Sequence, residues 1–212
     1  SPVRAVVVTN ADVDHVAGLL SLREGTRFAL WASVETLDVL AANPVFGVLA
    51  DDVVERCAMA LDKSFSPIPG VTMTPFAVPG KVALYLESTQ GADQRIGGQT
   101  VEIAGDGKRL FYIPGCSSVP DWLLARIDGA DLLLFDGTVF DDDEMIREGV
   151  GQKTGRRMGH VAIGGRSGTL ERFAGASVAR KILIHINNTN PILRPDSAER
   201  SAVVSAGWEV AF

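Results

Sequence analysis

Acidic residues and histidines follow three apolar segments of this sequence, at the points where strands are predicted to end. Asp12, Asp14 and His15 lie in the string TNADVDH, directly after the first apolar run. Asp136 ends the apolar run of LLLFDGT, and His185 follows the aliphatic run of KILIH. Residues just past the strand ends of an open sheet covered by helices converge on one crevice, where ligands usually bind. The sequence therefore predicts that these side chains lie close together.

Carboxylate oxygens and imidazole nitrogens together form a donor set that binds divalent metal ions. Two aspartates with two histidines suit Fe(II), Mn(II) or Zn(II), and two histidines with one carboxylate leave coordination positions for oxygen and substrate. The candidate metal ligands are Asp12, Asp14, His15 and His185. Other roles stay open at this stage. Either of the first two acids could cap the following helix, His185 could be a buried histidine bonded to a carbonyl, and Asp136 could close an Asp-Gly turn.

The third histidine, His160, lies in GRRMGH, a segment rich in glycine and arginine that periodicity assigns to neither helix nor strand. All three histidines are therefore expected beside strand ends or glycine loops, and none within a helical face. Arg156 and Arg157 lie beside His160 and could clamp substrate carboxylates through their planar guanidinium groups. A solvated loop is the alternative for both arginines.

Three asparagines follow His185 in the string HINNTNP, namely Asn187, Asn188 and Asn190. They could orient His185 or donate hydrogen bonds to substrate oxygens. Turn formation before Pro191 is the competing interpretation.

The elements that must position these residues alternate between strands and helices at both ends of the chain, which predicts a mixed α/β fold. The predicted strands are Arg4 to Thr9, Phe28 to Ala32, Val71 to Ala77, Val82 to Leu86, Thr100 to Ala104, Arg109 to Ile113, Asp131 to Asp136, Lys181 to His185 and Trp208 to Phe212. The predicted helices are His15 to Arg23, Val34 to Ala42, Pro120 to Ile127, Asp141 to Glu148, Gly168 to Phe173 and Ser197 to Ala206.

Length and composition predict one globular domain over residues 1–212. Hydrophobic residues make up 46% of the 212 residues and charged residues 22%, as in ordinary globular proteins. The net charge of -6 argues against nucleic acid as a partner, because phosphate binding needs a basic surface. No apolar run is long enough to cross a membrane. Cys57 and Cys116 have no paired spacing, which fits a reducing compartment, so we expect a cytoplasmic protein.

Several strings together resemble a known family. TNADVDHVAGLL has the placement and shape of the H-x-H-x-D-H signature of the metallo-β-lactamase fold, with Asn10 and Asp12 at the positions of the first two histidines. More specifically, the chain resembles the B proteins of pyrroloquinoline quinone (PQQ) biosynthesis along its whole length. The strings that carry this resemblance are TNADVDHVAGLLSLRE, PGKVALYLE, LFYIPGC, LLLFDGT, RRMGH and IHINNTNPIL.

The resemblance implies a four-layer αββα sandwich with the site at one edge of the sheets. It also implies an N-terminal segment with a cysteine-rich structural zinc site. That segment and the first strands of the fold are not in this sequence, so we expect an incomplete version of the domain. Asp14, His15 and His185 match metal ligands of the wider fold. Cys116 stands where hydrolases of the fold place a bridging aspartate, which favours one metal over two.

The activity implied by the resemblance is an Fe(II)-dependent hydroxylation. Its substrates are O2 and a small-molecule PQQ precursor, a cross-linked Glu-Tyr diamino acid whose tyrosine ring is oxidised. The equivalent loops of hydrolase relatives suggest that His160 and Asp136 bind substrate or move protons. Two alternatives stay open: a Zn- or Mn-dependent hydrolase of the parent fold, and a non-catalytic carrier that assists transport of PQQ or its precursor. A homodimer also stays open, and the donor set alone does not fix the metal.

Overall fold

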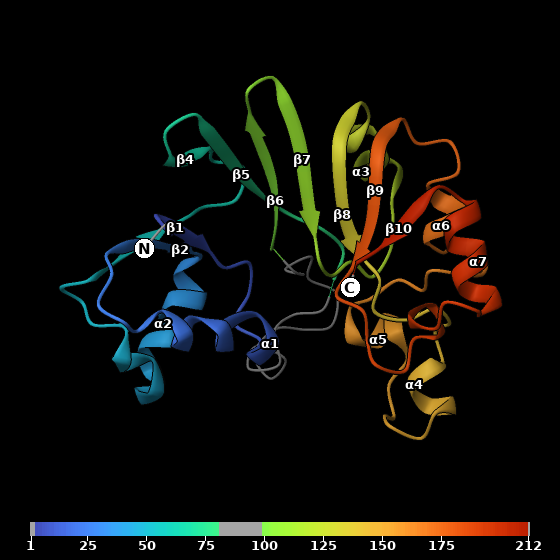
Figure 1. Cartoon of the computed structure of the whole chain (residues 1–212), viewed down its shortest axis with the longest axis horizontal. Coiled ribbons are helices and arrows are strands. Elements are labelled where there is room, and N and C mark those ends of the chain that lie inside the picture. The colour runs from blue at the N-terminus through green and yellow to red at the C-terminus, as the bar shows by residue number, and fades with distance from the viewer. Residues whose placement is uncertain (1–2, 81–98, 212) are drawn as a thin grey trace.

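The computed structural model of the chain describes residues 3–80 and 99–211. Within them, the strands form two β-sheets (Figure 1). The smaller sheet is parallel, in the order β1-β2-β3. Its strands are β1 (Ala5–Val7), β2 (Phe28–Ala32) and β3 (Val54–Ala58). The predicted strand Val82 to Leu86 lies outside the described residues.

The larger sheet is mixed, in the order β10-β9-β8-β7-β6-β5-β4. Its strands are β4 (Phe65–Ile68), β5 (Val71–Ala77), β6 (Gln99–Gly105), β7 (Lys108–Ile113), β8 (Ala130–Asp136), β9 (Val178–Ile184) and β10 (Trp208–Val210). Neighbours from β7 to β10 are parallel, and neighbours from β4 to β7 are antiparallel. The carboxyl ends of β7, β8 and β9 therefore meet at one edge of this sheet.

Short helices flank both sheets. The α-helices are α1 (Val13–Val16), α2 (Val34–Ala42), α3 (Asp121–Ile127), α4 (Glu144–Arg147), α5 (Gly155–Met158), α6 (Thr169–Arg172) and α7 (Ala198–Ser205). The 3-10 helices are η1 (Ala17–Leu22), η2 (Pro44–Val48) and η4 (Pro191–Leu193). In Figure 1, α1 and α5 lie near the edge where β7 and β8 end, whereas α6 and α7 lie beside β9 and β10. None of the described helices is long and apolar enough to cross a bilayer.

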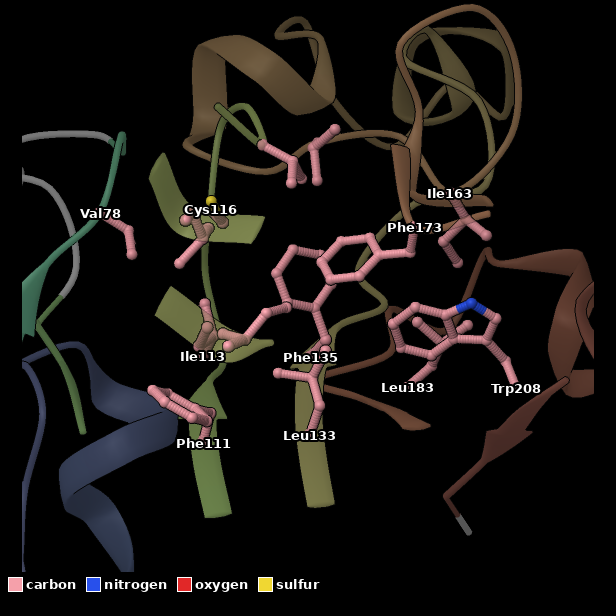
Figure 2. Packing of buried hydrophobic residues seen from close by; sticks show 14 of the residues in the cluster. Val78, Phe111, Ile113, Cys116, Leu133, Phe135, Ile163, Phe173, Leu183 and Trp208 are labelled. Carbon is pink, nitrogen blue, oxygen red and sulfur yellow. The ribbon is translucent and has the colours of Figure 1, made fainter. Parts of the chain in front are cut away.

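Each sheet has its own hydrophobic core. The core of the larger sheet is built around aromatic residues, and Figure 2 shows Phe135 of β8 beside Phe173 and Trp208. The ring centroids of Phe135 and Phe173 are 4.9 Å apart, and those of Phe173 and Trp208 are 5.3 Å apart. Edge-to-face aromatic pairs of this kind stabilise a core beyond the area they bury. A second core holds α1, η1 and α2 against β2, with Leu30 fully buried.

The predicted bounds of β2, α2 and β5 are confirmed. The strands β3 and β4 are missing from the prediction, because each carries residues that disfavour a strand. The β3 sequence VERCA contains two charges, and the β4 sequence FSPI contains a proline. Both strands lie at the edge of their sheet, where charges and proline are tolerated because one side of the backbone is unpaired.

Helix prediction was less accurate near the strand ends. The expected helix His15 to Arg23 is instead the short helix α1 followed by the 3-10 helix η1. His15 therefore lies within a single helical turn and not at the start of a longer helix. The segment before His160, expected to be a loop, contains α5, whose first turn is capped by Thr154 through the Arg157 amide. Single turns of this length carry too little periodicity to be predicted.

We expect Phe173→Ala to destabilise the protein by about 3–5 kcal/mol, because the side chain is buried and its removal leaves a cavity between two aromatic rings. Urea unfolding followed by tryptophan fluorescence or circular dichroism measures this change. Val204→Ala is the matched control, because Val204 is 57% exposed on α7. A Phe173→Ala midpoint equal to that of the control would contradict the proposed packing of this core.

Candidate metal centre

Asp14 and His15 are positioned by the turn that starts α1. The amide of Asp12 donates to the Asn10 side-chain oxygen at 2.9 Å, and the Asp12 carbonyl accepts from the amides of His15 and Val16. Val16 is buried in the smaller core and fixes the helix against β2. The local hydrogen bonds thus place Asp14 and His15 on the first turn of a short helix whose other side is held by packing.

His185 reaches the same place from the larger sheet. It follows β9 with a φ of 54°, a left-handed conformation that is uncommon for residues other than glycine. The neighbouring Gly137 amide donates to the Ile184 carbonyl at 2.8 Å. A Cβ atom at Gly137 would lie 2.9 Å from that carbonyl oxygen, so only glycine allows this approach. The strained turn carries the His185 ring toward α1.

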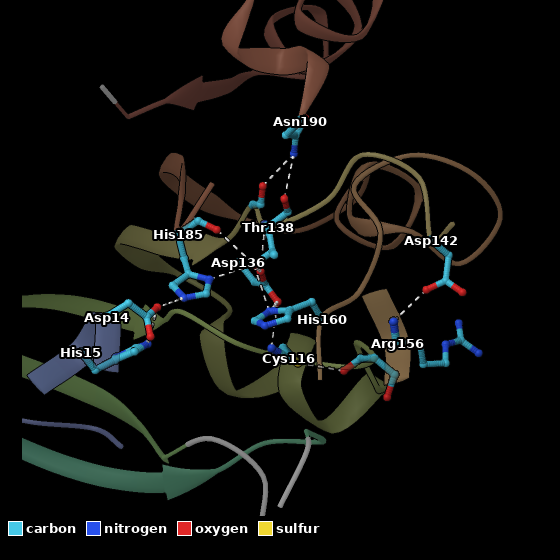
Figure 3. Close-up of polar contacts among 12 residues, drawn as sticks. Asp14, His15, Cys116, Asp136, Thr138, Asp142, Arg156, His160, His185 and Asn190 are labelled. Carbon is cyan, nitrogen blue, oxygen red and sulfur yellow. Dashed lines mark hydrogen bonds and ion pairs between the residues drawn. The ribbon is translucent and has the colours of Figure 1, made fainter. Parts of the chain in front are cut away.

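Asp14, His15 and His185 form one cluster of possible ligands (Figure 3). His185 Nε2 lies 2.8 Å from Asp14 Oδ2, and His15 Nε2 lies 3.8 Å from the same oxygen. Ligand atoms that each bind one first-row metal ion at roughly 2.0–2.2 Å stand about 3–4 Å apart, so this spacing fits a shared ion. The mixture of carboxylate and imidazole suits Fe(II), Mn(II) or Zn(II).

A second group contains Asp136 and His160 next to His185. Asp136 ends β8, is fully buried, and accepts four hydrogen bonds. Its Oδ1 accepts from the amide and hydroxyl of Thr138, and its Oδ2 accepts from the Cys116 amide and from His160 Nδ1 at 2.8 Å. Two carboxylate oxygens offer about four lone-pair sites. Asp136 is therefore saturated by the protein, and we infer that it orients His160 rather than binding a metal ion.

Burial and contacts between carboxylates and histidines shift the pKa values of Asp14, His15 and His160. Burial would raise the pKa of Asp14, but its hydrogen bond with His185 and the charge of the neighbouring histidines bring it below the usual value. Burial lowers the pKa of His15. Burial also acts to lower the pKa of His160, but the charge and hydrogen bond of Asp136 outweigh it, and the result is a raised pKa. Near neutral pH, Asp14 and His15 thus have the lone pairs that a cation needs.

Cys116 follows β7 and contributes its backbone, not its sulfur, to the site. Its thiol is buried in the larger core and donates to the Ser118 carbonyl at 2.9 Å. Burial and the nearby charge of Asp136 raise the pKa of the Cys116 thiol to about 12. Because a metal binds the thiolate, this position is poorly suited to hold one.

The three asparagines after His185 have different surroundings. Asn190 is buried, and its side chain accepts from the Ile192 amide and donates to the carbonyl of Gly137 at 2.8 Å. This arrangement favours the turn-forming role. The Asn187 side chain donates to Thr189, and Asn188 is exposed. Substrate contacts of these asparagines stay a prediction.

The remaining predicted site residues lie outside the two clusters. Asp12 is exposed and belongs to neither group of possible ligands. Arg156 and Arg157 are exposed on α5, and the Arg156 side chain extends away from the histidines (Figure 3). Metal binding by Asp12 and substrate binding by these arginines therefore stay predictions.

Thr138 lies at the centre of the site but was absent from the sequence prediction. Its hydroxyl is within hydrogen-bond distance of Asp136, His160 and His185. The string FDGT contained a usable signal, because an aspartate side chain commonly accepts from the residue two positions later in a turn. The turn alone, however, does not indicate which residues from other segments meet there.

Comparison with known proteins identifies the family. A family model described as a beta-lactamase superfamily domain matches residues 1–186. The coenzyme PQQ synthesis protein B of Methylorubrum populi is 54% identical over 216 residues, covering 100% of this chain and 71% of that protein. The protein of the same name from Xanthomonas campestris pv. campestris is 50% identical with the same coverage.

Solved structures give the same result. The crystal structure of Zn(2+)-bound PqqB from Methylobacterium extorquens has a TM-score of 0.91 and 51% identity, covering 100% of this chain and 71% of that one. The metallo-beta-lactamase fold protein YhfI from Bacillus subtilis, at 14% identity and a TM-score of 0.67 over 98% of this chain and 75% of that one, shares the fold. The predicted metallo-β-lactamase fold is thus confirmed, and the chain belongs to the coenzyme PQQ synthesis protein B family of the β-lactamase superfamily.

Proposed function

We propose that this chain is an iron- and oxygen-dependent hydroxylase that acts on the tyrosine-derived ring of the cross-linked Glu-Tyr precursor of PQQ. Its place in PQQ biosynthesis follows from its family. The observation that carries the finer proposal is the cluster of Asp14, His15 and His185, in which one carboxylate and two imidazoles face one another. This donor set suits Fe(II) and leaves coordination positions for oxygen and substrate.

The surroundings of the cluster support one metal ion rather than two. A dinuclear hydrolase needs further ligands, including a carboxylate that bridges the two ions. Asp136 has all its acceptor sites occupied by the protein, and the Cys116 thiol is buried with a raised pKa. A single ion held by three ligands is the arrangement that these contacts favour.

A cavity of about 370 Å³ beside the cluster supports an aromatic substrate. The three possible ligands form part of its lining, and the rest is mostly aliphatic. The other lining residues are Val7, Val8, Thr9, Tyr112, Leu134 and Ile184. Apolar walls with a few polar groups are typical of sites that hold a flat organic ring.

The chain's own residues have distinct roles in this reaction. Fe(II), when held by Asp14, His15 and His185, supplies the activation of O2. The Nδ1–H group of His160 donates a hydrogen bond to Asp136. The other ring nitrogen, Nε2, can therefore accept the proton of the tyrosine phenol. The buried Asp136 carboxylate then stabilises the imidazolium that forms. Each hydroxylation converts a ring C–H, O2, two electrons and two protons into ring C–OH and water, with an external two-electron donor such as ascorbate.

The exposed arginines of α5 are suited to the carboxylates of the precursor. Arg156 and Arg157 lie on the single helical turn that leads into His160. No ion pair of either side chain occurs within the described part of the chain. A planar guanidinium can bind a carboxylate through two parallel hydrogen bonds, and arginine side chains are long enough to reorient when a substrate arrives.

We expect Fe(II)-loaded protein mixed with the Glu-Tyr diamino acid and ascorbate to add whole oxygen atoms to the substrate when O2 is admitted. Mass spectrometry and ring absorbance follow the change, and Zn(II)-loaded protein is the control. His15→Ala should lose more than ~100-fold of the rate, because weakening the support of a metal ligand alone costs about 10–100-fold. Unchanged substrate that still binds would favour a carrier, and cleavage of an ester or amide without O2 uptake would favour a hydrolase.

His160→Gln should separate proton transfer from metal binding. We expect Fe(II) affinity to stay within a few-fold of the parent, whereas the hydroxylation rate falls by about 10²–10⁴-fold, the usual contribution of a positioned general base. Equilibrium dialysis of the metal and single-turnover kinetics measure the two quantities. An unchanged rate would exclude His160 as the base, and a metal affinity as low as that of His15→Ala would make it a ligand.

The double variant Arg156→Gln/Arg157→Gln should raise KM for the diamino acid about 10-fold or more and change kcat little, because it removes binding that is equal in the ground and transition states. Arg180→Gln is the control for lost surface charge, since Arg180 of β9 pairs with Glu209 of the edge strand β10. Equal KM values for the double variant and the control would show that these arginines do not bind the substrate and are solvated surface residues.

A further inference from the structure

We propose that Thr138 is the positioning residue of the metal centre: its hydroxyl fixes the tautomer and orientation of His185. Thr138 Oγ1 lies 2.7 Å from Asp136 Oδ1, 2.8 Å from His185 Nδ1 and 3.0 Å from His160 Nδ1. The side chain is 8% exposed, so water has little access to these contacts. Figure 3 shows Thr138 next to Asp136, near the two histidines.

The single hydroxyl proton of Thr138 can be assigned from these distances. A hydroxyl has one proton and two lone pairs. Besides the two ring nitrogens, whose roles depend on their tautomers, two oxygen acceptors compete for the proton, namely Asp136 Oδ1 at 2.7 Å and the His185 carbonyl at 3.0 Å. The carboxylate is nearer and charged, and hydrogen bonds to charged acceptors are the stronger ones. If the proton pointed elsewhere, two oxygen acceptors would face each other at 2.7 Å in a buried place.

Once Thr138 donates to Asp136, the tautomer of His185 follows. The contact between Thr138 Oγ1 and His185 Nδ1 then needs its proton on the nitrogen, so His185 Nδ1–H is the donor. The Nε2 atom thus has a lone pair aimed at Asp14 Oδ2, 2.8 Å away. Two acceptors at this distance are bridged by a proton or by a metal ion, and a bound ion would take the place of the proton in the hydrogen bond between His185 and Asp14. The hydroxyl of Thr138 thereby leaves His185 Nε2 as the ring nitrogen that can bind a metal ion.

The same residue connects the metal cluster to the proposed base. Asp136 accepts from both Thr138 and His160, and the rings of His160 and His185 stack with centroids 5.1 Å apart. Outer partners of metal-bound histidines fix ring orientation and tautomer in this way in many metal sites. Asp136 orients His160 directly and His185 through Thr138.

The backbone around Thr138 does not depend on the hydroxyl, so its removal is a clean test. The Thr138 amide donates to Asp136, and its carbonyl accepts from the Asn187 amide at 3.1 Å and from the Asn190 side chain at 3.3 Å. Thr138→Val keeps the shape of the side chain but removes the hydroxyl. Thr138→Ser keeps the hydroxyl and removes the methyl group.

The test uses Zn(II) binding by the whole chain. We expect Thr138→Val to weaken Zn(II) affinity about 10–100-fold, measured by competition with a chromophoric chelator, and Thr138→Ser to restore it to within about 3-fold of the parent. In ¹H–¹⁵N spectra of the Zn(II)-loaded parent, His185 should show a protected Nδ1–H proton, which Thr138→Val should lose. Circular dichroism and the Tm establish that both variants are folded.

Two results would overturn the proposal. Zn(II) binding by Thr138→Val as tight as by the parent would show that the hydroxyl does not fix the tautomer and orientation of His185 for metal binding. Equal weakening in Thr138→Ser and Thr138→Val would assign the effect to packing of the methyl group. The role of Thr138 rests on the metal centre and not on the proposed hydroxylation, and neither readout uses turnover, so it can fail while the hydroxylase proposal stands, or the reverse.

Discussion

The buried carboxylate of Asp136 is the interaction on which the rest of the site depends. It is fully buried and takes four hydrogen bonds from three separate segments, namely the loops that follow β7 and β8 and the segment that follows α5. A buried charge is tolerated only when its partners are complete. The loop at Cys116, the turn at Thr138 and the ring of His160 are thus held in one arrangement, because each provides a donor that the carboxylate needs.

A chain of contacts connects Asp136 to the possible metal ligands and to the smaller sheet. Thr138 connects Asp136 to His185, and His185 contacts Asp14 on α1. Asp14 and His15 belong to the part of the chain that packs on the smaller core, whereas His185 follows a strand of the larger sheet. A bound ion would therefore join two separately packed units, and the precision of its site depends on how firmly each unit holds its ligands.

The sequence predicted the strands that bear the chemistry better than the connections between them. Central parallel strands such as β8 and β9 are long apolar runs, so their ends, and hence the closeness of Asp136 and His185, could be foreseen. The approach of Asp14 and His15 could not be derived in this way, because they follow β1 of the other sheet. Single-turn helices such as α5 are too short to show the hydrophobic periodicity by which helices are predicted from sequence. The role of Thr138 was hidden because it depends on which atoms of distant segments face each other. That information appears only when β8 and β9 are placed side by side.

The turns beside the metal cluster contain residues that differ from the histidine-rich signature of the wider fold. The first two histidines of the H-x-H-x-D-H signature are replaced here by Asn10 and Asp12, and these two residues form a hydrogen bond that shapes the start of α1. By resemblance, Cys116 stands at the position of the bridging aspartate, and its amide donates to Asp136. In the proposed single-metal centre, these residues would support the turns that carry Asp14, His15 and Asp136, and an ion with open coordination positions beside an apolar cavity would favour oxygen chemistry on a ring over attack by hydroxide.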